Sequence, residues 1–389
     1  MLGGVLLFTA LVYLRSLGDG FVSDDDTLVL GNPYIGQWSF LWKSLFRGEY
    51  WFADRVRDLA RYRPLLLAWT GLNYHLFGFN PVGWHATMVA VHLVAVWLVF
   101  KVAVRLTGDG RGALLAALLF GLLPVHAEVV SWVSGFGLVM SAAFALAAFY
   151  VFIGRAESRN WLAAMGLYAL ALLSHETAAT LPALIGCYVF LLEQRATDES
   201  GPERMGARIR SALLCMLPFV LEVFLYLVVR ARALGFVLTN PNIPVSNVTV
   251  AQVLMTVPRV FVEYLAVLAI PWMAGPSHRV LIVTSPASPH FYLSVAALLM
   301  LVGGSFVLLR NHPRRRLYLF CLAWMALALA PAMDLFAFLE DQIVHDGYAY
   351  LASAGGCVLV ADWALNLGRA GALAKRVSPA HCQRPSLCL

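Results

Sequence analysis

Residues 160–193 read "NWLAAMGLYALALLSHETAATLPALIGCYVFLLE". Two apolar runs flank a polar turn, His175–Glu176. Each run has about 17 residues, which is the minimum length of a helix that crosses a membrane. Because two crossings must fit into these 34 residues, we expect the turn to lie below the membrane surface. Ionisable residues at such a depth are costly and usually functional. The stretch therefore predicts a helical membrane protein with a recessed polar site.

The composition of the whole chain agrees with this prediction. Of its 389 residues, 60% are apolar and only 13% are charged, and the mean hydropathy is +0.74. A soluble protein of this size could not cover so much apolar surface. The six cysteines indicate no disulfide framework, since four lie inside apolar runs. We therefore predict an all-α, polytopic membrane protein of about 10–12 transmembrane helices.

Apolar runs separated by short polar breaks define the predicted spans. They lie near residues 2–17, 82–106, 111–124, 129–153, 160–175, 177–193, 210–230, 291–310, 317–336 and 350–367. Residues 64–78 are too short to cross and are predicted to form an interfacial helix. Residues 249–273 are long enough, but they contain Pro258, Arg259 and Glu263, which suits an interfacial or re-entrant helix better.

The positive-inside rule orients these spans. With the N-terminus inside, seventeen of the 28 Lys and Arg residues fall in cytoplasmic connections or in the tail. We expect one transmembrane domain over residues 1–370 and a short cytoplasmic tail over 371–389. Residues 18–81 would form the first extracytoplasmic loop and residues 231–290 the second outer segment. The expected location is a bacterial inner (plasma) membrane.

Ionisable residues gather on the predicted outer side. The acidic run "SDDD" supplies Asp24 and Asp25, which we predict to be catalytic, with one of them as a general base. A sugar carried on a lipid phosphate has a stable anionic leaving group, so its transfer needs a carboxylate base and cations to hold the phosphate. The predicted phosphate-binding residues are Arg61, Arg63, His126 and His175, and the predicted supporting acids are Glu128 and Glu176.

Several motifs together resemble one known family. In order along the chain, they read "FVSDDDTLVLGNP", "YRPLLLAWTGLNYHLFGFNPVGWHATMVAVHL", "LLPVHAEVVSWVSG", "LSHETAATLP" and "YAYLASAG". This order is similar to that of the GT-C superfamily of membrane glycosyltransferases, and in particular to the TMTC-type O-mannosyltransferases and their bacterial relatives. Those relatives usually carry tetratricopeptide repeats, and no internal repeat is evident in these 389 residues.

The resemblance implies a fold, an activity and further site residues. It implies a GT-C-like membrane domain and inverting transfer of a sugar from a polyprenyl-phosphate donor on the extracytoplasmic side, with the leading Asp as the base. The acceptor would be a hydroxyl of a protein or a glycan, and nucleic acid would not be a partner. It also adds Asp346, Tyr348 and Tyr350 as substrate-binding or supporting residues.

The chain departs from the family pattern at cationic positions. Phe136 and Gly347 stand where the family has Arg, His175 stands where it has Lys, and Leu138 stands where it has an acidic residue. These departures keep a second hypothesis open, in which the chain is an inactive relative that binds lipid-linked sugar or acts as a scaffold.

Two other possibilities are a transport function and a bound metal ion. Glu222 lies inside a predicted span, which is a position that secondary transporters use, although a structural carboxyl explains it more simply. Asp24, Asp25 and Glu128 could share a divalent cation with the substrate phosphate. The sequence requires no cofactor beyond this possible ion.

Overall fold

The computed structural model describes residues 1–49, 51–52, 61–154, 160–193, 202–237, 248–276, 278–338 and 342–377. Helices make up nearly all of its regular structure, and within these ranges the β-structure is one isolated bridge between His278 and Val344. The α-helices are α1 (Leu2–Tyr13), α2 (Trp38–Ser44), α3 (Pro64–Phe77), α4 (Pro81–Thr107), α5 (Gly110–Leu122), α6 (Ala127–Ser131), α7 (Gly137–Phe152), α8 (Trp161–Ser174), α9 (Leu181–Leu191), α10 (Pro202–Leu234), α11 (Val250–Ala269), α12 (Pro289–Leu309), α13 (Arg315–Leu329) and α14 (Ala349–Val377).

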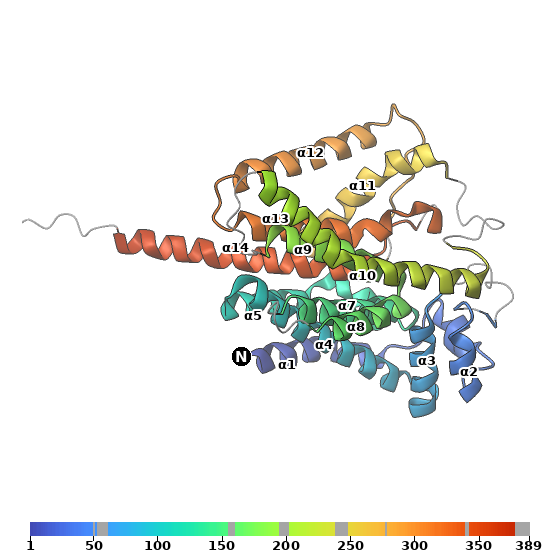
Figure 1. The fold of residues 1–389 in the computed structure, drawn as a ribbon. Coiled ribbons are helices and arrows are strands. Elements are labelled where there is room, and N and C mark those ends of the chain that lie inside the picture. The colour runs from blue at the N-terminus through green and yellow to red at the C-terminus, as the bar shows by residue number, and fades with distance from the viewer. Residues whose placement is uncertain are drawn as a thin grey trace, which may run out of the picture.

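The all-helical, polytopic prediction is confirmed. Among the described residues, seven helices are long and apolar enough to cross a membrane, or eight if the bent pair Gly110–Leu122 and Pro124–Ser131 forms one span. Three shorter apolar helices are Leu2–Gly18, Trp161–Ser174 and Glu176–Leu191. Most of these helices run along one common direction, which we take as the membrane normal (Figure 1).

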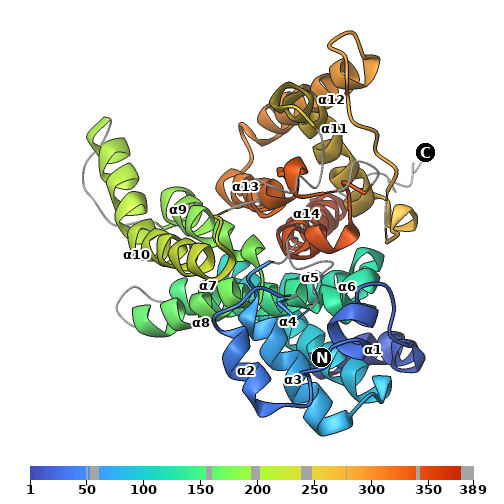
Figure 2. The ribbon, with the colours of Figure 1, turned by 90° about the vertical axis from the view of Figure 1, so that its right-hand side faces the viewer.

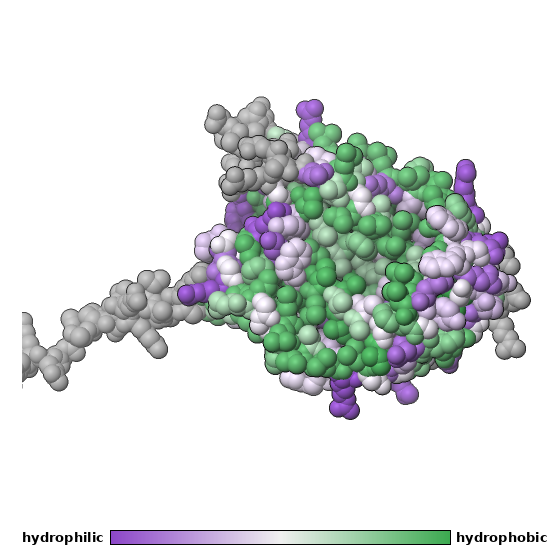
Figure 3. Space-filling model, turned by 90° about the horizontal axis from the view of Figure 1, so that it is seen from below, coloured by the Kyte–Doolittle hydropathy of each residue, from purple (hydrophilic) through white to green (hydrophobic). Residues whose placement is uncertain are grey.

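The helices are packed to different depths in the bundle. α7 lies at the centre, with 72% of its apolar window buried, whereas α12 is peripheral, with 6% buried. Viewed from the end of the bundle, α11 and α12 lie apart from α9 and α10, on the other side of α13 and α14 (Figure 2). The face seen from below is largely apolar, with hydrophilic residues toward both ends (Figure 3). This pattern is what a surface in contact with lipid requires.

Capping residues explain where α4 begins and ends and where α5 begins. The side chain of Asn80 accepts a hydrogen bond from the Val82 amide, and Pro81 occupies the first turn of α4. Gly108 ends α4 with φ +71°, a left-handed conformation that glycine adopts without strain. Asp109 then caps α5 by accepting from the Arg111 amide. Only two residues, Gly108 and Asp109, therefore separate the two helices.

Two segments at one end lie across the bundle. α2 and α3 run across the direction of α4 and α10 (Figure 1), and α3 has only 14 residues. This agrees with the expectation that residues 64–78 do not span. α11, by contrast, is long and apolar enough to cross, although residues 249–273 were expected to be interfacial or re-entrant.

Two predicted boundaries differ from the structure. The predicted span 129–153 is broken, because α6 ends at Ser131 and a new helix begins with the 3₁₀ turn Ser134–Phe136, whose first residue binds Asp25. α14 continues to Val377, so the predicted tail begins as helix. Residues 378–389 of that tail lie outside the described residues.

Candidate functional site

The acidic run divides into one buried and two exposed carboxylates. Asp25 is fully buried, whereas Asp24 and Asp26 are exposed. Asp25 Oδ1 accepts hydrogen bonds from the Ser134 amide (2.7 Å) and the Ser134 hydroxyl (2.6 Å), and Oδ2 accepts from the Val22 amide (3.0 Å). Burial raises the pKa of Asp25, and these hydrogen bonds oppose the rise. Both oxygens of Asp25 are thus engaged within the protein.

Arg63 is held between two carboxylates. Its Nε and Nη2 donate to Glu176 Oε2 and Oε1 at 3.0 and 2.8 Å, and its Nη1 lies 3.6 Å from Glu49 Oε2. Burial opposes the charge of Arg63, but Glu176 and Glu49 more than compensate and raise its pKa. Burial raises the pKa of Glu49, against the attraction of Arg63 and Arg61. Every guanidinium nitrogen of Arg63 therefore faces an acid of the protein itself.

Arg61 and His175 lie beside the same carboxylate. Arg61 Nε is 4.0 Å from Glu176 Oε1, and the Arg61 side chain keeps 36% of its surface exposed. His175 is buried, and its Nδ1 accepts a hydrogen bond from the Thr177 amide at 3.2 Å, which places the proton of the neutral ring on Nε2. Burial, together with the charge of Arg63, lowers the pKa of His175 well below its usual value. His175 is therefore neutral at pH 7, whereas Arg61 presents a charge at the surface of the site.

A second group of polar contacts surrounds the start of α14. Glu128 Oε2 accepts from the Gly347 amide at 2.7 Å. Asp346 binds the His278 ring through Oδ1 and the Gly275 amide through Oδ2, both at 2.7 Å. Asp346 thus attaches the segment that follows α11 to the N-terminal end of α14.

Tyr348 connects the two groups. Its ring lies 6.0 Å from the His175 ring and 5.3 Å from that of Phe338, measured between centroids. It follows directly on Gly347, which binds Glu128. The Arg63 and Glu128 groups are therefore neighbours at one end of the bundle.

His126 and Tyr350 lie deeper, among packed helices. His126 is fully buried, and its Nε2 donates to the Ser353 hydroxyl at 2.8 Å. Tyr350 donates to Nδ1 of His92 at 2.7 Å. Their rings are 4.4 Å apart. The structure thus brings His126 and Tyr350 together. Their hydrogen bonds, however, are made to other residues inside the bundle and not toward the site.

The 3₁₀ turn Ser134–Phe136 and the first two residues of α7 touch each part of the site. Ser134 binds Asp25. A Cβ added at Gly137 would lie 2.9 Å from the Ser174 carbonyl oxygen and 3.7 Å from the His175 ring. A Cβ added at Gly347 would lie 2.9 Å from Leu138. We call residues 134–138 the α7 turn, since they link the acidic run, the His175 turn and the start of α14.

At two positions that depart from the family pattern, 136 and 347, the structure shows close contacts with apolar side chains. Phe136 is fully buried, and its ring lies 4.4 Å from that of Trp69 on α3. A Cβ at Gly347 would come within 2.4 Å of Val129 Cγ1, in addition to its approach to Leu138. Phe136 thus fills its position with an apolar ring, and apolar side chains restrict the space at Gly347, where Glu128 Oε2 also lies 3.6 Å from the added Cβ.

Several residues of the site were missed by sequence reasoning. Three of them contact predicted residues: Glu49 lies beside Arg63, Ser134 binds Asp25 and His278 binds Asp346. The fourth, Arg230, acts on His175 through its charge. Arg230 is the one that a sequence signal could have found, because it is a charged residue at the end of the predicted span 210–230. In the structure it is only 7% exposed. Its neighbour one turn earlier, Tyr226, donates to the Tyr62 carbonyl at 3.0 Å.

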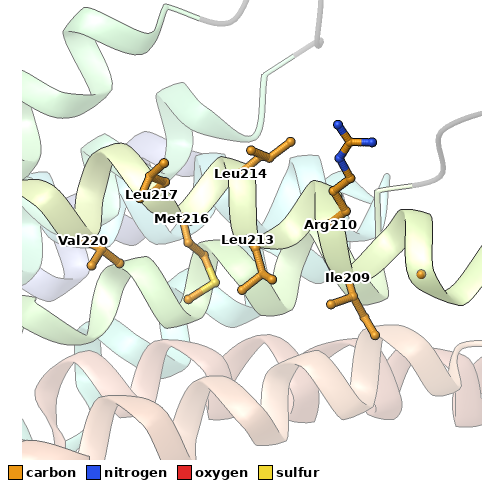
Figure 4. Close-up of a pocket in the computed structure, with 8 residues that line it drawn as sticks. Ile209, Arg210, Leu213, Leu214, Met216, Leu217 and Val220 are labelled. Atoms are coloured by element: carbon orange, nitrogen blue, oxygen red, sulfur yellow. The ribbon is translucent and has the colours of Figure 1, made fainter.

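Neither a metal centre nor the apolar groove along α10 coincides with this site. Among the described residues, no three His, Cys, Asp or Glu side chains form a group that could hold a metal ion, so Asp24, Asp25 and Glu128 do not converge as such a site. An apolar groove of about 610 Å³ lies along the N-terminal half of α10, away from the polar groups (Figure 4). Glu222 lies on the same helix and has a buried Oε2 for which no hydrogen-bond partner is found within the described ranges.

Comparison with known proteins gives consistent matches. Residues 62–220 match the model of a family described as dolichyl-phosphate-mannose-protein mannosyltransferase. The chain is 33% identical to Protein O-mannosyl-transferase Tmtc1 of Drosophila melanogaster over 190 residues, 48% of this chain and 22% of that protein. It is 28% identical to Protein O-mannosyl-transferase TMTC3 of Mus musculus over 387 residues, 92% of this chain and 41% of that protein.

A solved structure is also similar. It is described as archaeal oligosaccharyltransferase AglB from Archaeoglobus fulgidus in complex with an inhibitory peptide and a dolichol-phosphate; it is 13% identical, with a TM-score of 0.43, over 98% of this chain and 52% of that one. The sequence matches confirm the family resemblance predicted from the motifs. The chain spans less than half the length of the two curated relatives.

Proposed function

We propose, from its relationship to the protein O-mannosyltransferases, that this chain is a membrane mannosyltransferase. The donor would be mannose linked to a polyprenyl phosphate such as dolichyl phosphate, and the acceptor a hydroxyl group of a protein. The reaction would take place at the end of the bundle that carries α2 and α3, on the extracytoplasmic side.

The observation that carries the proposal is the different environment of two adjacent acids. Asp25 is buried with both oxygens bound, whereas Asp24 is exposed. A general base must be able to reach the acceptor hydroxyl at about 3 Å. Asp24 therefore suits the role of base.

In the proposed step, Asp24 takes the proton of the acceptor hydroxyl as its oxygen attacks C1 of the sugar. The bond between C1 and the phosphate oxygen breaks, and the electron pair leaves with the lipid phosphate, whose charge changes from −1 to −2. Attack from the face opposite the phosphate inverts the configuration at C1. The leaving group requires no proton because the phosphate is already a stable anion.

Cations near Glu176 would stabilise the departing phosphate. Arg61 is suited to this, because its side chain is partly exposed. Arg230 is a second candidate, since Tyr226 one turn earlier binds the backbone between Arg61 and Arg63. Arg63 would instead hold the site together, and His175 would contribute no charge. Arginine suits phosphate because its planar fork donates two parallel hydrogen bonds.

The lipid part of the donor would lie against apolar helix surface. The groove along α10 is lined by Ile209, Leu213, Met216 and Val220, which point from one face of the helix (Figure 4). Such a wall supports binding of a hydrocarbon chain, and α10 continues from it toward Arg230.

A transfer assay with matched variants tests the base. Membranes containing the chain are given radiolabelled mannosyl-phosphoryl-polyprenol and a Ser/Thr-rich acceptor. We expect Asp24→Asn to lower kcat by roughly 10²- to 10⁴-fold, the usual contribution of a general base. Asp26→Asn is the matched control, since Asp26 is also exposed two residues away, and it should retain activity. Equal transfer by the wild type and Asp24→Asn would refute the assignment.

The filled cationic positions favour one alternative function. Phe136 and Gly347 have no cationic side chain, so a donor phosphate would meet fewer positive charges than the family pattern provides. A chain that binds the lipid-linked sugar without transferring it would account for this. In the same membranes, saturable retention of the labelled donor with no product would select this alternative.

A further inference from the structure

Ser134 binds the acidic run to the start of the helix that leads into α7. It gives Asp25 two hydrogen bonds, from its amide at 2.7 Å and from its hydroxyl at 2.6 Å, across 109 residues of sequence. The amide at the start of a helix has no partner within that helix. Asp25 therefore caps the 3₁₀ turn that leads into α7, and the positive end of the helix favours its carboxylate.

The geometry of the acidic run separates Asp24 from Asp25. Asp25 Oδ2 accepts from the Val22 amide at 3.0 Å, which closes a tight turn around the two residues between them. Ser23 has φ +54°, a left-handed conformation that costs free energy for a residue with a side chain. The backbone then turns into the short helix Asp26–Leu30. With Asp25 directed inward and fixed at both oxygens, Asp24 is left at the surface.

The α7 turn extends this contact to the rest of the site. Three residues after Ser134, Gly137 packs closely on the Ser174 carbonyl, directly before His175. His175 in turn precedes Glu176, which binds Arg63. The position of the acidic run is thus fixed relative to the cationic group through a few short, rigid contacts.

We propose that Ser134 and Asp25 are positioning residues that fix Asp24 toward the acceptor hydroxyl. This inference rests on the proposed transfer reaction. Asp25 itself takes no proton in the reaction. Loss of the Ser134 hydroxyl displaces Asp24, and displacement of a reacting group by about 1 Å can cost roughly 100-fold in rate.

The kinetic test compares substitutions at three positions. We expect Ser134→Ala to lower kcat about tenfold with the KM for the lipid-linked donor unchanged, and Ser134→Thr, which keeps a hydroxyl, to recover most of the loss. Ser131→Ala is the control, since Ser131 lies three residues away and gives Asp25 no hydrogen bond. Asp25→Asn should keep measurable transfer and the acidic limb of the wild-type pH–rate profile, whereas Asp24→Asn should not.

An activity-independent measurement separates this inference from the proposed function. Asp24→Cys is labelled with a membrane-impermeant maleimide in the wild-type and Ser134→Ala backgrounds, and we expect the labelling rate to change several-fold when the hydroxyl is removed. An unchanged rate, together with an unchanged kcat where transfer is measurable, overturns the inference. If Asp25→Asn is as inactive as Asp24→Asn while its Tm is unchanged, the inference is also overturned. Absence of transfer in the wild type would contradict only the proposed function.

Discussion

At the scale of the residue, neighbours decide which charges are available. Arg63 and Arg61 are two residues apart, yet Arg63 is bound to Glu176 and Glu49 while Arg61 keeps part of its surface exposed. His175 stands at a position that the family pattern gives to Lys, but burial keeps it neutral. The charge of this site is therefore smaller than its basic residues suggest.

The neutrality of His175 has a consequence for stability against pH. Its pKa in the folded protein lies below the value of about 6.5 expected in the unfolded chain. Between these two values the unfolded state binds more protons, so His175 contributes stability above about pH 6.5 and loses it as the pH falls toward the folded-state pKa. One such proton accounts for at most about 1.4 kcal/mol per pH unit.

We therefore expect His175→Asn to flatten the decline of Tm between pH 7 and pH 5. Asparagine can still accept the hydrogen bond from the Thr177 amide, so the turn should persist. Thermal unfolding in detergent, followed by tryptophan fluorescence, measures both proteins. A decline of Tm in the variant as steep as in the wild type would show that His175 is protonated in the folded state.

The sequence indicated several of the ionisable residues that the structure brings together, but not the contacts that they make. It placed Asp25, Arg63 and Glu128 among ionisable residues on the outer side. It could not show that Asp25 binds Ser134, that Arg63 binds Glu176, or that Glu128 binds Gly347, because these pairs are 109, 113 and 219 residues apart. Burial of a single carboxylate within a run of three depends on such distant contacts.

At the scale of the element, helix ends carry the site. The α7 turn, the η7 turn Glu176–Thr180 after α8 and the turn Asp346–Tyr348 before α14 all lie where helices begin. The sequence predicted α4 closely, as residues 82–106, because Asn80, Pro81 and Gly108 mark its ends. It missed the break before α7, because "VVSWVSGFG" lies within a long, mostly apolar run, although its Ser134–Gly135 pair is typical of a turn.

Close packing of the α7 turn predicts the effect of adding one methyl group. A Cβ at Gly137 would meet the Ser174 carbonyl oxygen at 2.9 Å, and this backbone atom cannot move away alone. We expect Gly137→Ala to destabilise the protein by about 1–3 kcal/mol, the usual cost of overpacking, and to lower transfer. Melting temperatures in detergent and the transfer assay measure the two effects.

Gly166→Ala on α8 is the matched control. Nothing lies within 4 Å of a Cβ at that position, and alanine favours a helix over glycine by up to about 1 kcal/mol. The control should be neutral or stabilising. If both variants had the wild-type Tm, the α7 turn would not be closely packed as described.

At the scale of the whole molecule, composition predicted the class of fold, and the lengths of the apolar runs predicted the number of membrane crossings. High hydropathy and short polar breaks were enough to predict a polytopic helical bundle. The number of crossings was harder to predict, because α8 and α9 are shorter than a usual span and α11 is long enough to be one. Length alone cannot say which apolar helices meet lipid on all sides and which are covered by neighbours.

The orientation of the bundle predicts which side each end faces. We expect Asp26→Cys to react with a membrane-impermeant maleimide from the extracytoplasmic side, and Arg315→Cys to react only after the membrane is permeabilised. Both positions are exposed, and the background would lack the six native cysteines. Labelling of Asp26→Cys from the cytoplasmic side alone would reverse the orientation and contradict an extracytoplasmic reaction.

The glycine at position 347 also constrains how this protein can change over time. Even the first carbon of any side chain there would collide with Val129, and Leu138 leaves little further room. An arginine placed there by one substitution would have to displace both side chains. Smaller residues at 129 and 138 would make room for it, but each alone would leave a cavity. We therefore expect position 347 to accept a basic side chain best when residues 129, 138 and 347 are replaced together.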